Sequence, residues 1–175
     1  MTTIFIGTGH LKLETLAQAA RDGVRFDLDA EARARVASSR AAFEALLERG
    51  DAVYGANTGF GLLSDVRIPG SDVERLQENL IRSHCAGTGD PFPVPVVRIM
   101  MVLRAAVLAR GHSAVRPELI DSLLSLLNAG ITPCIPSRGS VGASGDLTPL
   151  AHLSLAMMGE GDVFMNEALA GILPQ

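Results

Sequence analysis

The tripeptide Ala143-Ser144-Gly145 has residue types and a spacing that favour a reaction of the backbone itself. Glycine lacks a Cβ, so the chain at Gly145 can approach itself closely and adopt angles that other residues avoid. The amide nitrogen of Gly145 can then attack the carbonyl carbon of Ala143 and close a five-membered ring. Loss of water from the ring and from the Ser144 side chain leaves an exocyclic methylidene group. The product is an electrophile made from the chain, which needs no diffusible cofactor.

The residues around Ser144 do not fit three other kinds of site. A phosphate-binding loop requires a Lys, and residues 139–144 contain none. A nucleophile elbow requires Gly two residues after the serine, where this chain has Asp146. A zinc site requires clustered His and Cys, whereas the histidines are scattered at His10, His84, His112 and His152. The simplest alternative is a flexible Gly/Ser loop capped by Asp146, with His10, His112 and His152 as structural or surface residues.

A helix must follow the triad and position it. Asp146 or Thr148 suits a helix cap, and Pro149 suits a first turn. An apolar helix is expected over Leu150–Met158, before the turn sequence GEG. The ring would then lie near the positive end of a helix dipole, which stabilises developing negative charge.

The remaining elements are predicted to be mostly helical, with a few short strands near the N-terminus. Alternation over 3–6 and 24–29 favours two strands that pair with each other, separated by a helix that ends at Gly23. Apolar spacing favours an amphipathic helix over 30–49 that ends at Gly50.

Glycine and proline divide the middle of the chain. The segment YGANTGFG and the residues after it read as a loop, and Ser71 and Glu74 have the spacing of a capping box. Further helices are expected at 96–110 and from Pro117 to Asn128, with a Pro-rich hinge before the first and a loop at 131–146 after the second. The arginines of these helices are interpreted as mostly solvated or ion-paired, and a position facing a subunit neighbour is the alternative for Arg98, Arg104 and Arg110.

Composition narrows the function classes. The chain has 175 residues, enough for one domain, and carries 15 basic against 19 acidic residues with no basic stripe, which argues against nucleic-acid binding. Arginines interrupt every long apolar stretch, so no membrane span is expected, and the N-terminus does not resemble a signal peptide. Two cysteines, Cys85 and Cys134, make no disulfide framework and favour a reducing cytoplasm.

Two long motifs carry a family resemblance. GSVGASGDLTPLAH at 139–152, together with YGANTGFG at 54–61, resembles the aromatic amino acid lyases in sequence and in order. The resemblance implies that Ala143, Ser144 and Gly145 form 4-methylidene-imidazol-5-one (MIO), and that Tyr54 is the enzymatic base. The alternative for Tyr54 is a loop tyrosine packed against the core. A base role near neutral pH requires a positive neighbour, a helix end or a hydrogen bond, because the hydroxyl of tyrosine ordinarily titrates near 10.

The same resemblance places substrate selection at Ser83-His84. This pair is similar to that of the histidine-specific members, so elimination of ammonia from L-histidine to give trans-urocanate is expected. His84 can hydrogen-bond a polar imidazole, and such a bond discriminates strongly against other substrates. Tyrosine or phenylalanine lyases and aminomutases of the family are the alternatives, because some tyrosine aminomutases also carry Ser-His. A histidine at a helix C-terminus that contacts the last carbonyl groups is the structural alternative for His84.

The resemblance also implies a fold and an assembly. The expected fold is mainly α with a few short N-terminal β-strands, the N-terminal part of the fumarase/aspartase-like helical lyase fold. Residues 1–175 are expected to form one MIO-bearing N-terminal region, without the C-terminal helical bundle that completes the pocket in family homotetramers. We therefore expect little turnover from this chain alone. A non-catalytic, truncated module is the other hypothesis.

Overall fold

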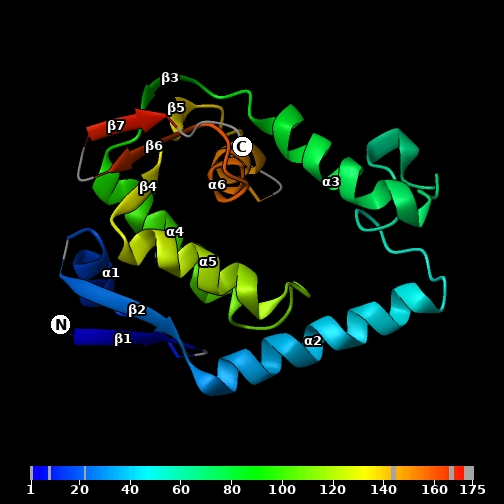
Figure 1. Ribbon diagram of the computed structural model, residues 1–175, viewed down its shortest axis with the longest axis horizontal. Coiled ribbons are helices and arrows are strands. Elements are labelled where there is room, and N and C mark those ends of the chain that lie inside the picture. The colour runs from blue at the N-terminus through cyan, green and yellow to red at the C-terminus, as the bar shows by residue number, and fades with distance from the viewer. Residues whose placement is uncertain (1, 8, 22, 143–144, 166–167, 172–175) are drawn as a thin grey trace.

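The computed structural model describes residues 2–7, 9–21, 23–142, 145–165 and 168–171. These residues are mainly helical, as predicted, and Figure 1 shows the short strands gathered on one side of the molecule, with α2 and α3 extending away from them. The helices are α1 (Leu13–Ala19), α2 (Ala30–Glu48), the 3-10 turn η1 (Gly61–Leu63), α3 (Gly70–His84), α4 (Val94–Leu108), α5 (Pro117–Asn128) and α6 (Leu147–Met157). The strands are β1 (Thr2–Ile6), β2 (Val24–Leu28), β3 (Thr88–Pro91), β4 (Ile131–Pro133), β5 (Pro136–Arg138), β6 (Asp162–Met165) and β7 (Ala168–Gly171).

The packed core lies between α4 and α5. Pro117 occupies the first turn of α5, as the sequence predicts, and the apolar residues that follow recur at helical spacing. The buried residues of the two helices are Val97, Met101, Val102, Ala105, Leu108, Ile120, Leu123, Leu124 and Leu127. Each fully buried Leu or Ile stabilises the fold by about 1.5–3 kcal/mol. This pair of helices is the rigid base on which the other elements are placed.

The predicted pairing of the first two strands is confirmed, and the strands are parallel. Thr2 pairs with Val24 and Ile6 with Leu28, with α1 as the connection between β1 and β2. The open edge of β2 is covered by a side chain. Asn128 at the end of α5 accepts a hydrogen bond from the Phe26 N–H at 2.8 Å and donates one to the Phe26 carbonyl at 2.8 Å. The amide therefore acts as one more strand residue at this edge.

Arg98 on α4 links the C-terminal ends of α1 and α5. Its side chain is only 4% exposed, and its guanidinium donates to the carbonyl oxygens of Ala19, Arg21 and Leu127 at 2.9, 3.3 and 3.3 Å. These carbonyls lie at the C-terminal ends of α1 and α5, where backbone oxygens lack helical partners and the dipole favours a cation. The expectation of a solvated arginine is wrong for Arg98, which is buried against these carbonyls.

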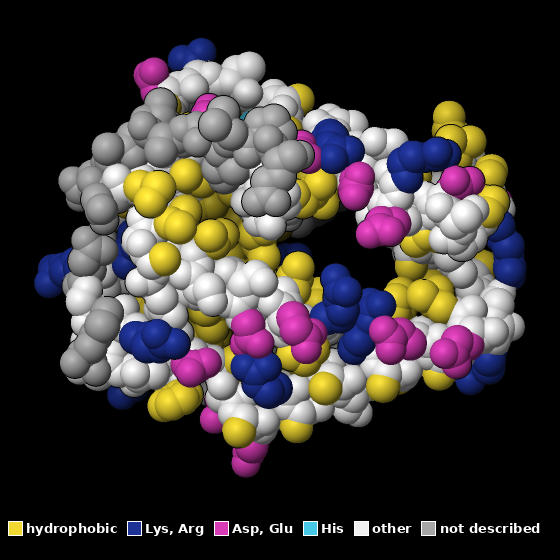
Figure 2. Space-filling view, in the orientation of Figure 1, with side chains coloured by type: hydrophobic (Ala, Val, Ile, Leu, Met, Phe, Trp, Pro, Cys, Tyr) yellow, Lys and Arg dark blue, Asp and Glu magenta, His cyan; other side chains and the backbone are white. Residues whose placement is uncertain are grey.

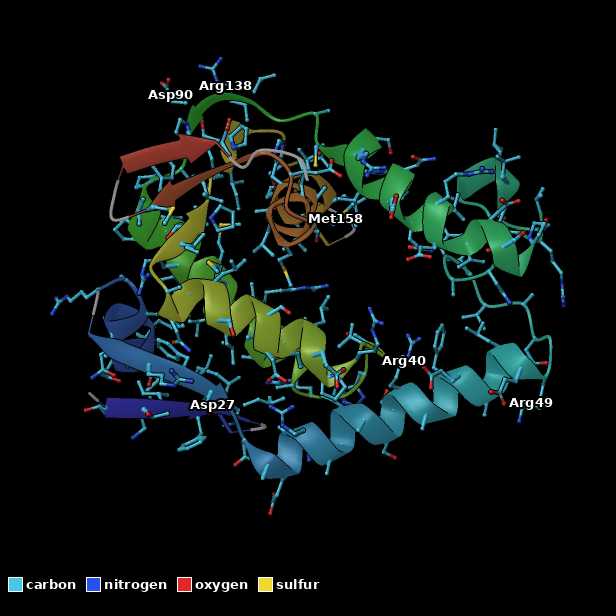
Figure 3. The ribbon with its side chains drawn as sticks, in the orientation of Figure 1. Asp27, Arg40, Arg49, Asp90, Arg138 and Met158 are labelled. Carbon is cyan, nitrogen blue, oxygen red and sulfur yellow. The ribbon has the colours of Figure 1, made fainter. Side chains whose placement is uncertain are left out.

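Several predicted boundaries are corrected by the structure. Helix α3 begins at Gly70 with Pro69 in the cap position, two residues before the predicted cap, so Ser71 lies inside the helix. The Pro-rich hinge contains β3, and the predicted loop at 131–146 contains β4 and β5. Strand β3 pairs with β5, and β6 lies between β4 and β7. Figure 3 shows Asp90 and Arg138 at the outer edge of the β3–β5 pair.

Helices α2 and α3 enclose the space next to this core. Asp29 caps α2 by accepting hydrogen bonds from the backbone of Glu31 and Ala32, and the helix ends before Gly50, as predicted. Figure 1 shows α2 running away from the strands and α3 returning toward α6. Arg33 of α2 holds Asp121 of α5 through two hydrogen bonds of 2.8 and 2.6 Å. Because α2 runs away from the strands, the loop at 49–69 that connects α2 to α3 lies far from them.

Candidate active site

The loop with the motif YGANTGFG is held by its own polar side chains. Asn57 accepts a hydrogen bond from the Val53 N–H at 2.8 Å and donates to the Asp51 carbonyl at 2.9 Å. Thr58 accepts from the Gly55 N–H at 3.2 Å. The amide of Gln77 on α3 donates to the Gly55 carbonyl at 2.8 Å and ties the loop to that helix. The motif thus fixes the backbone on both sides of Tyr54.

The glycine at position 59 explains the tightness of this loop. A Cβ added there would lie 2.6 Å from the Leu63 carbonyl oxygen, closer than any side chain tolerates. The compact turn brings Phe60 against Tyr54, with ring centroids 5.9 Å apart at an interplanar angle of 73°. Tyr54 is 66% exposed, so its ring is supported on one side and open on the other. This arrangement differs from a loop tyrosine buried in the core.

The predicted selection pair lies in the last turn of α3. The His84 Nδ1 lies 2.8 Å from the Leu80 carbonyl oxygen, and the Ser83 hydroxyl donates to the same oxygen at 2.8 Å. A carbonyl oxygen only accepts, so Nδ1 of His84 carries a proton, and in the neutral ring Nε2 is the nitrogen with the lone pair. Ser83 is exposed, whereas His84 is half-buried. The helix-end contact and a binding role are therefore compatible for His84.

Tyr54 and His84 line one open cavity of about 540 Å³. Helices α3 and α6 supply most of its wall, and Figure 2 shows this face of the molecule hollowed between them. The lining residues are Tyr54, Phe60, Leu80, Ile81, His84, Arg104, Leu147, Leu150, Ala151 and Ser154. The wall is mostly apolar with a few polar groups, as in small-molecule sites. Ser83 is not among the lining residues.

Arg104 is a lining residue that sequence reasoning missed as part of a site. It is half-buried on α4, and burial lowers the pKa of its guanidinium. No carboxylate among the described residues forms an ion pair with it. The signal in the sequence is a cation within an apolar helix, a signal that Arg98 on the same helix shares. Phe60 was also missed, although it lies inside the motif that points to Tyr54.

The start of α6 places the ring-forming segment beside this cavity. Ala143 and Ser144 lie outside the described residues. Gly145 and Asp146 both have left-handed backbones, with φ of +77° and +58°. Leu147 lines the cavity, so Gly145 lies within about 7 Å of the cavity wall. Asp146 occupies the cap position, as predicted, but its side chain makes no capping bond, since Pro149 removes one of the amide hydrogens that it would accept.

Neither a metal cluster nor a membrane-spanning helix is seen in the described part of the chain. No group of three or more His, Cys, Asp or Glu side chains there is placed to hold a metal ion. None of the described helices is both long and apolar enough to cross a bilayer.

Comparison with known proteins identifies the family. The chain is 50% identical over 165 residues to a histidine ammonia-lyase from Anaeromyxobacter sp. (strain K), covering 94% of this chain and 32% of that protein. The crystal structure of histidine ammonia-lyase from Trypanosoma cruzi matches with a TM-score of 0.89 at 37% identity, covering 98% of this chain and 33% of that one. Tyrosine aminomutase from Streptomyces globisporus matches with a TM-score of 0.90 at 36% identity, covering 98% and 32%.

The matched region extends over nearly the whole chain. This chain spans about a third of the length of the curated relatives it matches. The family profile described as aromatic amino acid lyase covers residues 11–172, which include the loop of Tyr54, the end of α3 and the segment that leads into α6. This chain belongs to the aromatic amino acid lyase family.

Proposed function

We propose that this chain carries the ring-forming and proton-abstracting part of a histidine ammonia-lyase. The observation that carries the proposal is the single cavity that Tyr54 and His84 share beside the start of α6. Its relatives named histidine ammonia-lyase, about 50% identical over most of the chain, support histidine as the substrate.

The described residues next to the triad fit an MIO group formed from Ala143, Ser144 and Gly145. A Cβ added at Gly145 would meet no atom within 4 Å, so there is room at this position. Asp146 holds a left-handed backbone directly after the triad, and no described residue hydrogen-bonds its buried Oδ1. The group would supply an electrophilic methylidene that activates the substrate amine as a leaving group. This chemistry requires neither a metal nor a diffusible cofactor.

Tyr54 and His84 have distinct roles in this proposal. The Tyr54 side-chain oxygen, as the deprotonated phenolate, takes a proton from the β-carbon of histidine as ammonia leaves, which gives trans-urocanate and returns Tyr54 to its hydroxyl form. The open side of the Tyr54 ring faces solvent in the chain alone, which leaves room for substrate. His84 accepts a hydrogen bond from the substrate imidazole N–H at its unprotonated Nε2. Ser83 supports His84, since its hydroxyl lies 3.1 Å from the His84 Nδ1.

We assign the working form to a homotetramer in the cytoplasm, in histidine catabolism. Large apolar side chains support assembly, because Leu62, Leu63 and Val66 are exposed next to the Tyr54 loop. Cys85 and Cys134 are free thiols, which suits a reducing compartment. A small amino acid is the substrate, and neither a membrane nor a nucleic acid is part of the proposal.

A tyrosine aminomutase is the second candidate. The likeness to the solved tyrosine aminomutase supports it, at 36% identity over nearly the whole chain. The cavity wall would hold a phenol as well as an imidazole, since Phe60, Leu80 and Leu150 are apolar. Histidine is favoured because His84 gives the wall a hydrogen-bonding group suited to an imidazole.

A substrate panel tests the proposal. The complete gene product is incubated with L-histidine, L-tyrosine and L-phenylalanine, and the products are separated by chromatography. We expect urocanate from histidine and little product from the other two. Coumarate, cinnamate or a β-amino acid as the main product would contradict histidine as the substrate.

A further inference from the structure

Two segments of the proposed site meet at Gly87, three residues after His84. The Gly87 N–H donates a hydrogen bond to Nε2 of His152 on α6 at 3.2 Å. A Cβ added at Gly87 would lie 2.9 Å from that nitrogen and 3.1 Å from the Cβ of Pro136. The backbone after His84 is therefore pressed directly against the ring of His152.

Gly139, at the start of the motif that contains the triad, lies against Gly87 from the other side. A Cβ added at Gly139 would lie 3.2 Å from the Cα of Gly87 and 2.7 Å from Cγ2 of Thr148. Thr148 lies one helical turn before His152 on α6. Gly87 is thus enclosed by the beginning of the ring-forming segment and by the helix that follows it.

The hydrogen bond fixes the chemical form of His152. A backbone N–H only donates, so Nε2 accepts and the proton of the neutral ring is on Nδ1. Burial lowers the pKa of His152 and favours this neutral form. His152 is not among the residues that line the cavity, so it is not placed to touch substrate.

We propose that His152 is a positioning residue that holds the backbone after His84 against α6, the helix that follows the MIO-forming triad. This inference rests on the proposed function, because the role assigned to His152 is to keep His84 and the MIO-forming triad beside the same cavity. Because Gly139 packs against Gly87, holding Gly87 in place also restricts the backbone that leads into the triad. His152 acts through the Gly87 amide and takes no part in the reaction itself.

Three variants of the complete gene product test the role. His152→Gln keeps an acceptor near the position of Nε2, His152→Leu removes it, and Leu153→Val removes one methylene from a buried core residue on the same helix. The rate of ring closure after cell-free synthesis is followed by intact mass, and the unfolding midpoint of each variant is recorded.

We expect His152→Leu to close the ring about tenfold more slowly, since the partly buried Gly87 N–H loses its acceptor. His152→Gln should recover most of the rate, and Leu153→Val should close at the wild-type rate even where its unfolding midpoint falls. Equal rates in wild type and His152→Leu, or no recovery in His152→Gln, would overturn the positioning role alone. A wild-type protein that never loses water would overturn the proposed function and this inference with it.

Discussion

Tyr54 and His84 face one cavity although they come from different elements, a glycine-rich loop and the last turn of α3. The link between those elements is the hydrogen bond from Gln77 of α3 to the Gly55 carbonyl. The two parts of the site are therefore held together by a side-chain-to-backbone hydrogen bond that does not involve Tyr54 or His84.

Replacing Tyr54 with Phe should separate ring closure from turnover. The variant keeps the edge-on contact with Phe60 but loses the oxygen that takes the proton. We expect kcat on histidine to fall by about 10²–10⁴-fold, with the ring formed as in wild type. Steady-state kinetics and intact mass on the complete gene product measure the two effects. Turnover within a few-fold of wild type would remove Tyr54 from the base role.

Substitution of His84 should change specificity. His84→Leu leaves a substrate imidazole without its acceptor, so kcat/KM for histidine should fall by about 10–100-fold. The ratio of kcat/KM for histidine to that for phenylalanine should fall with it. His112→Leu is the matched control, because His112 is exposed and lies outside the cavity. An unchanged ratio in His84→Leu would show that selection lies elsewhere.

Asn128 should be important for folding stability. Asn128→Leu removes both hydrogen bonds to the Phe26 backbone and leaves two partly buried groups without partners. The free energy of unfolding should fall by about 2–4 kcal/mol. Urea denaturation measures the change, and Ser38→Ala on the exposed side of α2 provides the baseline. A loss below about 0.5 kcal/mol, the size usual for surface substitutions, would mean that β2 needs no edge partner.

Much of the fold was predictable because its signals are local. Pro117 and the apolar residues after it specify α5, and alternation specifies β1 and β2. Strands β3 to β7 are only three or four residues long, too short to show a period. The burial of Arg98 was not predicted, because the carbonyls of Ala19 and Leu127 that accept from it are distant in sequence and no local pattern encodes them.

The candidate site was predictable through its motifs. Tyr54, His84 and the triad all lie in segments that resemble the family. Phe60 and His152 lie inside these motifs, but their contacts, like the position of Arg104, depend on the tertiary structure and were not predicted. The capping box failed because the cap of α3 is Pro69, two residues before Ser71.

Acid should weaken the fold through His152. Burial lowers its pKa below the ordinary value of 6.5, so the unfolded chain binds a proton more readily than the folded one. Stability is therefore unaffected above pH 6.5 and is lost as the pH falls from 6.5 through the folded pKa. Urea denaturation of wild type and His152→Gln from pH 8 to 5 measures this loss. Parallel curves for the two proteins below pH 6.5 would contradict the assignment.

The intact mass of the purified complete gene product, with fragmentation across residues 142–146, tests the central claim most directly. The account predicts a deficit of two water molecules confined to Ala143, Ser144 and Gly145, and its absence in Ser144→Ala. An unmodified mass in the wild-type protein, folded and purified under the same conditions, would contradict it.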